Sequence, residues 1–181
     1  WQKDKTPEIG IKREEYVQTM ERYWKMGMIV SLIGLRRSGK STLLLQFIKR
    51  LTDELLVPSN NILYVNFEDS RFIGELGPDL LQDIYETFVE YLKPNRKPLI
   101  FFDEVQAVPG WEKFVNSLYE RKAADIFVSG SSAKLLHSEL SAVLTGRHLV
   151  INVYPLAFRE FLLFHKIEIP DAMRLIRQKT K

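Results

Sequence analysis

The segment at residues 34–41, GLRRSGKS, constrains the fold of this chain more than any other feature. It matches G-x-x-x-x-G-K-[ST] at every fixed position, which Gly34, Gly39, Lys40 and Ser41 occupy. Glycine is needed where the backbone takes positive φ, so that successive N–H groups turn inward around phosphate oxygens. The lysine reaches the terminal phosphates, and the hydroxyl helps to hold Mg²⁺. The pattern therefore predicts a phosphate-binding loop.

The residues on either side of the loop favour the same interpretation. Residues 28–33 are a short apolar run rich in β-branched side chains, which predicts a buried strand. Residues 42–51 carry apolar side chains at helical spacing, so the loop opens onto a helix N-terminus whose dipole favours phosphate. For Arg36 and Arg37, solvated and phosphate-neighbouring roles both stay open. The predicted phosphate-binding residues are Gly34, Arg36, Arg37, Ser38, Gly39, Lys40, Ser41 and Thr42.

A second apolar run, residues 99–103, ends in the acidic pair Asp103-Glu104. In a parallel sheet, ligands bind beyond the carboxyl ends of the strands, so Asp103 is expected beside the glycine loop. There it would hold Mg²⁺ together with Ser41, through waters, because Mg²⁺ dehydrates reluctantly. Glu104 points differently and is expected to polarise a water for in-line attack on a γ-phosphate. We predict Ser41 and Asp103 as the metal residues.

Two further polar positions have two interpretations each. In Ser129-Gly130-Ser131-Ser132, a hydroxyl either binds the attacking water or γ-phosphate, or caps the helix expected at residues 132–137. Arg147 is either an arginine finger, acting within the chain or from a neighbouring subunit, or a surface arginine that opens a strand. On the catalytic interpretation of both positions, the predicted catalytic residues are Lys40, Glu104, Arg147 and Ser129.

The rest of the chain alternates between strand and helix patterns, which predicts an α/β fold with a parallel sheet covered on both faces. We expect residues 1–10 to be an irregular lead-in and residues 11–168 to be one domain. Residues 169–181 are expected to start a further helical segment. The further strands are expected at residues 61–67, 125–129 and 148–153, and the further helices at residues 12–26, 78–92, 111–120 and 156–164.

Composition narrows the functional classes. The 181 residues suffice for one domain with a sizeable core, and the net charge of +3 permits an acidic partner such as nucleic acid without requiring one. The absence of cysteine excludes disulfides, thiolate metal sites and cysteine nucleophiles, and is compatible with a cytoplasmic protein. The apolar runs are too short to span a bilayer. We expect a cytoplasmic protein that does not enter the membrane.

In these residues, the chain resembles the prokaryotic AAA-type P-loop ATPases in which the ATPase domain precedes an uncharacterised C-terminal domain. It is similar in outline to archaeal ATPases and to signal-transduction ATPases with numerous domains. The matching stretches are residues 11–14 (IKRE), 34–44 (GLRRSGKSTLL), 62–68 (ILYVNFE), 102–106 (FDEVQ), 110–112 (GWE), 115–118 (VNSL), 129–136 (SGSSAKLL), 144–147 (LTGR) and 155–162 (PLAFREFL).

The resemblance implies an ASCE-type P-loop NTPase fold, with a five-stranded parallel sheet in the order 5-1-4-3-2 and helices on both faces. It also implies ATP and Mg²⁺ as ligands, Glu104 as the catalytic carboxylate, and a polar sensor within residues 129–132. The leading hypothesis is Mg-dependent ATP binding and hydrolysis that drives a conformational or assembly change.

Two alternatives stay open. One is a nucleotide-gated binding or signalling module with negligible turnover, and the other is a DNA-associated ATPase. A homo-oligomer and an unidentified protein partner are compatible with each hypothesis.

Overall fold

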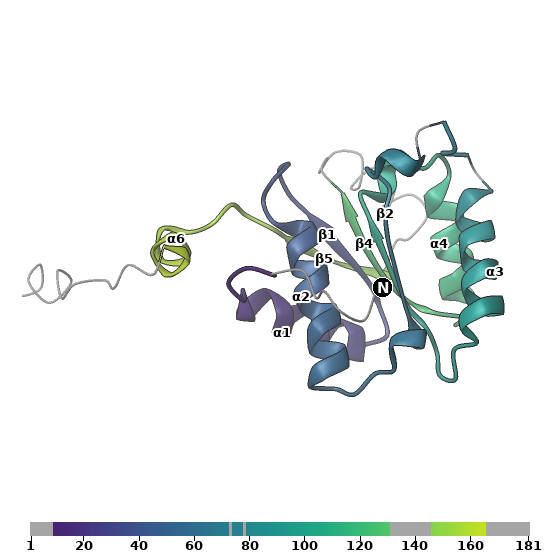
Figure 1. The fold of residues 1–181 in the computed structure, drawn as a ribbon, viewed down its shortest axis with the longest axis horizontal. Coiled ribbons are helices and arrows are strands. Elements are labelled where there is room, and N and C mark those ends of the chain that lie inside the picture. The colour runs from purple at the N-terminus through teal and green to yellow at the C-terminus, as the bar shows by residue number, and fades with distance from the viewer. Residues whose placement is uncertain (1–8, 73, 78, 131–145, 166–181) are drawn as a thin grey trace, which may run out of the picture.

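The computed structural model describes residues 9–72, 74–77, 79–130 and 146–165. Within them, five parallel strands form one sheet in the order β2-β3-β4-β1-β5 (Figure 1). Read from its other edge, this is the expected order 5-1-4-3-2, and the expected P-loop NTPase sheet is confirmed. The strands are β1 (Ile29–Ile33), β2 (Ile62–Asn66), β3 (Leu99–Asp103), β4 (Asp125–Gly130) and β5 (His148–Asn152).

The register of the sheet brings the polar strand ends together. Strand β1 lies between β4 and β5, with Leu32 level with Ser129 on one side and Ile151 on the other. Asn66 at the end of β2 is level with Asp103 at the end of β3. Because all five strands run in the same direction, the glycine loop, the acidic pair and Ser129 all follow the carboxyl ends of their strands. We call this end of the sheet the loop edge.

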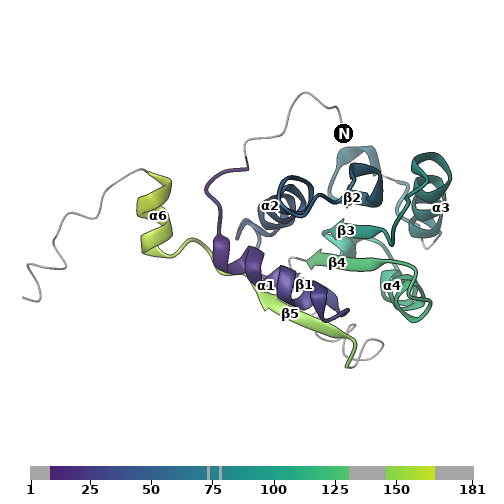
Figure 2. The same ribbon diagram turned by 90° about the horizontal axis from the view of Figure 1, so that it is seen from below.

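Two pairs of helices cover the sheet. Helices α1 (Glu14–Lys25) and α2 (Lys40–Asp53) lie over one face, and α3 (Leu80–Leu92) and α4 (Trp111–Glu120) over the other (Figure 2). Successive residues of a strand face opposite layers. In β1, Val30 and Leu32 pack with α1 and α2, whereas Ile29 and Ile33 pack with the α4 side. The strand runs are therefore apolar on both faces, as a doubly covered sheet requires.

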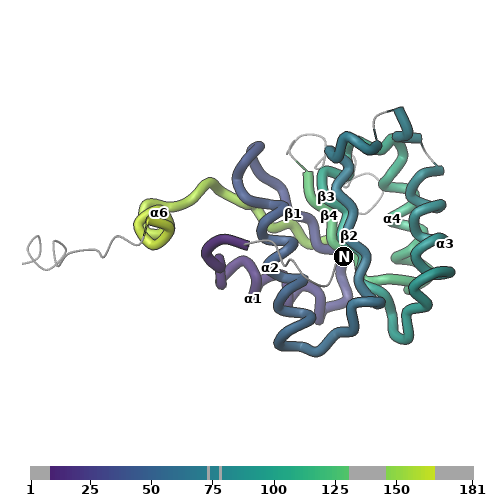
Figure 3. Tube along the Cα trace, in the orientation of Figure 1, coloured from purple at the N-terminus to yellow at the C-terminus, as the bar shows by residue number. Residues whose placement is uncertain are grey.

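The last described helix, α6 (Phe158–Phe164), differs from these four because none of its residues is buried. It lies beyond α1 and α2, at the end of a connection that leaves the sheet after β5 (Figure 3). Three short 3₁₀ turns lie between the strands and helices, at Ser59–Asn61, Ser70–Phe72 and Val105–Ala107. The expected helix at residues 132–137 and the expected segment at residues 169–181 lie outside the described residues. Among the described helices, none is long and apolar enough to cross a membrane.

Candidate nucleotide-binding site

The glycine loop joins the end of β1 to the start of α2. Gly39 is the N-cap of α2 and has φ +96°, a left-handed conformation that glycine takes without steric cost. Arg37 also has positive φ, at +64°, so the loop turns twice within three residues. Gly34 is required for a different reason. A Cβ built on it would lie 2.2 Å from the carbonyl oxygen of Val153, so no side chain fits there.

The N-terminus of α2 is suited to an anion. Its first turn contains no acidic residue, and no side chain among the described residues caps it, so these residues leave its N–H groups and its dipole without a side-chain partner. A cavity of about 460 Å³ opens beside it. Its lining includes the cationic residues Arg36, Arg37 and Lys40, and Arg36 also pairs with Glu68 at 3.1 Å. The full lining is Arg36, Arg37, Gly39, Lys40, Ser41, Thr42, Glu68 and Glu104.

Lys40 holds a buried positive charge between the loop and the acidic strand end. Its ammonium group donates to the carbonyl oxygens of Gly34 at 3.3 Å and Leu35 at 3.2 Å. It also forms an ion pair with Glu104, with 3.3 Å between Nζ and Oε1. A buried charge needs such partners, because leaving water is costly. The ammonium group therefore lies where a ligand anion would compete with Glu104 for it.

Asp103 is fully buried and accepts two hydroxyl hydrogen bonds. The Ser129 hydroxyl donates to Oδ1, and the Tyr64 hydroxyl donates to Oδ2 at 2.9 Å. The Ser129 oxygen also accepts from the Glu104 N–H at 3.0 Å. Burial, and then the neighbouring Asp103 carboxylate, raise the pKa of Tyr64 far above its ordinary value. Tyr64 thus stays a donor, and both hydroxyls fix the orientation of the Asp103 carboxylate.

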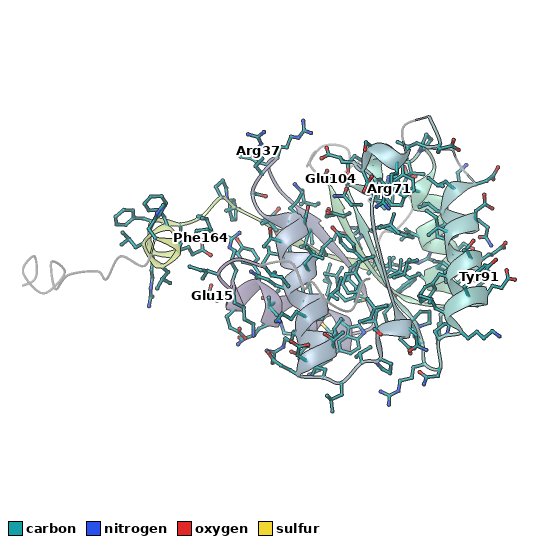
Figure 4. All side chains as sticks on the ribbon, viewed as in Figure 1. Glu15, Arg37, Arg71, Tyr91, Glu104 and Phe164 are labelled. Atoms are coloured by element: carbon teal, nitrogen blue, oxygen red, sulfur yellow. The ribbon has the colours of Figure 1, made fainter. Side chains whose placement is uncertain are left out.

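Glu104 occupies a strained position. Its φ of +53° is uncommon for a residue with a side chain, and such strain concentrates at functional sites. Its carboxylate is held at one oxygen by Lys40 and at the other by the amide of Gln106, which donates at 2.7 Å. This side chain lies at the loop edge of the sheet, as does Arg37 (Figure 4).

The oxygen donors at this edge fit Mg²⁺. Magnesium is commonly held by one or two carboxylates together with substrate phosphates and waters, and not by a cage of protein ligands. The Ser41 hydroxyl and the Asp103 carboxylate are oxygen ligands that suit Mg²⁺. Because both Asp103 oxygens accept hydroxyl hydrogen bonds, contact through water suits this carboxylate. Across the part of the chain that the structure describes, no group of three or more His, Cys, Asp or Glu side chains is placed to hold a metal.

Most of the residues predicted for the site lie together at the loop edge, but Arg147 does not. It precedes β5, and its carbonyl accepts from the N–H of Ile29 at the start of β1, at the opposite edge of the sheet. Its guanidinium group donates to Asn116 at 2.6 Å and Glu120 at 2.7 Å. The structure therefore does not bring Arg147 to the loop of its own chain. A role from a neighbouring chain stays a prediction.

Ser129 also differs from expectation in its contacts. Its hydroxyl joins Asp103 to the Glu104 backbone, whereas the sequence interpretations had it binding water or phosphate, or capping a helix. Of the run that contains it, residues 131 and 132 lie outside the described residues.

Several residues around the site were not singled out from the sequence. Tyr64 and Gln106 belong to stretches on which the resemblance rests, but nothing in the pattern distinguished them from strand and turn residues. Arg13 and Gln46 line a second cavity of about 350 Å³ on the other flank of the loop. Arg13 stands in the matching stretch at residues 11–14, and that was the one available signal.

The loop, the uncapped helix and the acidic strand end have the arrangement of a P-loop. The sequence model of the AAA domain family matches residues 27–162. An uncharacterised protein of Haemophilus influenzae is 38% identical over 167 residues, which are 92% of this chain and 40% of that protein. An uncharacterised protein of Methanocaldococcus jannaschii is 38% identical over 139 residues, which are 76% of this chain and 29% of that protein.

Solved structures agree on the fold. Hsp104 of S. cerevisiae, in complex with casein, superposes with a TM-score of 0.60 at 15% identity, covering 87% of this chain and 29% of that one. PCH-2 of C. elegans superposes with a TM-score of 0.51 at 18% identity, covering 79% and 40%. The chain belongs to the AAA domain family and is an AAA-type P-loop ATPase domain. It spans less than half the length of the relatives named above.

Proposed function

We propose that the chain binds Mg-ATP and hydrolyses it to ADP and phosphate. The observation that carries this proposal is the meeting, at one sheet edge, of an uncapped helix N-terminus, the buried Lys40 ammonium group and the Asp103-Glu104 strand end. This combination provides an anion site, a positive charge and a carboxylate beside it. Catalysis of phosphoryl transfer needs little more from a protein than positioning and electrostatic stabilisation.

In this proposal the nucleotide occupies both cavities that flank the loop. The first cavity is polar, has the helix N-terminus in its wall, and suits the phosphates. The second cavity adds the apolar side chains of Ile11, Pro155, Leu156 and Phe164, which suit the flat face of a nucleobase. Arg37, Gly39 and Thr42 line both cavities, so a nucleotide can extend across the loop from one to the other.

The proposed reaction uses Glu104 as the group that polarises the attacking water. Water attacks the γ-phosphorus, the bond to the β-phosphate oxygen breaks, and ADP leaves as the new P–O bond forms. Lys40 binds the phosphate oxygens and so releases the Glu104 carboxylate, which then accepts a hydrogen bond from the water. Mg²⁺ bound near Ser41 and Asp103 would neutralise charge on the phosphate oxygens.

A single-turnover assay of Glu104→Gln tests this proposal. The amide keeps the size of the side chain but cannot accept the water proton, so we expect ATP binding to be retained and hydrolysis to fall at least about a hundredfold. Glu86→Gln, an exposed substitution on α3, is the control and should hydrolyse like the original chain. Hydrolysis at the original rate by Glu104→Gln would contradict the proposal.

One observation favours a second candidate, a nucleotide-gated binding module with negligible turnover. In this structure both Glu104 oxygens are engaged, by Lys40 and by Gln106. If nucleotide binding does not release them, the water is never polarised. The same assay distinguishes the candidates, because the original chain would then leave its bound ATP intact.

The wider functional expectations belong to this proposal too. We propose that nucleotide state is coupled to a conformational or assembly change in a cytoplasmic protein, with self-association and a protein partner. Binding of DNA is a further alternative, and salt-dependent binding at low ionic strength would support it.

A further inference from the structure

Arg13 connects three segments that are far apart in the sequence. It precedes α1 as its N-cap residue, and only 8% of its side chain is exposed. Its guanidinium group donates to Glu160 on α6 at 2.7 and 3.2 Å, to the Ser38 carbonyl at 3.1 Å and to the Tyr154 carbonyl at 3.0 Å. One planar face of the group lies over the Tyr16 ring, 4.4 Å from its centre. A single side chain thus joins the phosphate loop to α6.

Helix α2, which follows the glycine loop, also binds the segment that contains Arg13. The backbone N–H of Arg13 donates to Gln46 of α2 at 3.1 Å, and the Gln46 amide donates to the carbonyls of Ile9 and Ile11, both at 2.9 Å. The Gln46 side chain is buried. The segment before α1 is therefore fixed to the same helix whose N-terminus faces the phosphate cavity.

Helix α6, in contrast, has little packing to hold it. None of its residues is buried, and Phe158 and Phe161 are exposed. Glu160 accepts both from Arg13 and from the Ala157 N–H, at 2.7 Å, so the same carboxylate caps α6 and anchors it. Phe164 projects from α6 (Figure 4). It approaches Gly10 and lines the second cavity.

We propose that Arg13 is a positioning residue that couples the phosphate loop to α6, so that nucleotide occupancy changes where α6 lies. This inference rests on the proposed function, because it takes the ligand to be a nucleotide. A ligand that fills the second cavity contacts α6 directly, and one that binds the loop moves the Ser38 carbonyl to which Arg13 is bonded. Only arginine has a fork of donors that can serve Ser38, Tyr154 and Glu160 together.

The test measures the position of α6 in the whole chain. Because the sequence contains no cysteine, Lys113→Cys on α4 and Leu163→Cys on α6 give two unique sites for spin labels. Both positions are exposed. Distances between the labels are measured by pulsed electron resonance with and without Mg-ATP. Nucleotide affinity is measured by titration of the same samples.

We expect one narrow distance without nucleotide and a shifted distance with it. In Glu160→Gln, which loses the charge that Arg13 pairs with, we expect a broader distance distribution and nucleotide binding weakened about tenfold. Arg13→Lys should behave in the same way, since lysine lacks the fork. The control is Asp53→Asn, which removes an exposed ion pair of α2 and should leave the label distance and the nucleotide affinity unchanged.

The outcomes separate this inference from the proposed function. If nucleotide binds but α6 does not move, or if Glu160→Gln and Arg13→Lys keep the original distance and affinity, the coupling is overturned. If the original chain binds no nucleotide, the proposed function fails and the coupling with it. A broadened distance in nucleotide-free Glu160→Gln would then still assign the anchoring of α6 to the Arg13–Glu160 pair.

Discussion

Asp103 and Glu104 are held by different kinds of partner. Asp103 accepts from two hydroxyl groups, whereas Glu104 accepts from the Lys40 ammonium group and an amide. Hydroxyl groups leave a carboxylate charged and oriented, which suits an indirect role beside a cation. An ion pair is exchanged when a competing anion arrives. These contacts support a steady role for Asp103 and a switchable one for Glu104.

The first prediction concerns the Tyr64 hydroxyl. Tyr64→Phe removes a hydrogen bond to a charged group in a partly buried position, so we expect a loss of about 1.5 kcal/mol in the free energy of unfolding at pH 7. Because the pKa of Tyr64 is raised in the folded chain, its contribution is fully present below the ordinary pKa of 10.0. Above that pH the unfolded chain ionises first, and the contribution declines.

Urea unfolding at pH 7 and at pH 10.5 measures this effect. The difference between the original chain and Tyr64→Phe should be smaller at the higher pH. A difference that stays constant or grows would contradict the raised pKa of Tyr64, which burial and then the Asp103 carboxylate produce.

At the scale of elements, the loop depends on its contact with the end of β5. The N–H of Val153 donates to the Ile33 carbonyl at 2.7 Å. The Val153 carbonyl oxygen lies 2.2 Å from the position that a Cβ of residue 34 would take. The first glycine of the pattern is therefore needed for packing between segments, whereas Gly39 is needed for its left-handed backbone. The sequence motif records both requirements without distinguishing them.

Gly34→Ala should accordingly destabilise the fold, apart from any effect on ligand binding. The added Cβ would meet Val153 at 2.2 Å, so backbone must shift, and overpacking of this kind costs about 2–3 kcal/mol. Gly77→Ala is the matched control, because no atom of the described residues lies within 4 Å of a Cβ there, and its effect should stay within about 0.5 kcal/mol. Equal melting temperatures for the two variants would refute this account of Gly34.

The packing of α2 on the sheet gives a third prediction. Phe47 is fully buried, and its ring contacts those of Trp24, Phe101 and Phe127 at centroid distances of 6.3, 6.3 and 5.2 Å. Phe47→Ala should lower the free energy of unfolding by about 3–5 kcal/mol, measured by denaturant titration. Phe158→Ala on α6 removes the same ring from a position that is 76% exposed and should cost less than about 0.5 kcal/mol. Similar losses for both variants would contradict the assigned core.

At the scale of the whole molecule, the sheet and its covering helices could be predicted from the sequence. Apolar runs bounded by turn residues marked all five strands, and the spacing of apolar residues marked α1 to α4. The contacts made by Arg13 and Tyr64 could not be predicted, because they join residues 147 and 39 positions apart in the sequence. Such pairs depend on how the elements pack, which no local pattern records.

The position of Arg147 leads to a prediction about assembly. Its ion pair with Glu120 is exposed, and a surface ion pair of this kind is worth at most about 1 kcal/mol, so it does not prevent a contact with a second chain. If Arg147 completes the site of a neighbour, Arg147→Ala and Lys40→Ala should each lack hydrolysis, and mixing them should restore part of it. The Lys40→Ala chain would supply the arginine to the intact site of its partner. No recovery at any mixing ratio would exclude a role for Arg147 between chains.

The central claim, that a nucleotide lies against the N-terminus of α2, is tested most directly by calorimetric titration with ATP and Mg²⁺. The account predicts one nucleotide per chain, and a loss of at least about a hundredfold in affinity for Lys40→Ala, because a buried ammonium group that binds phosphate is removed. Absence of binding by the original chain, or equal affinity in Lys40→Ala, would contradict the account.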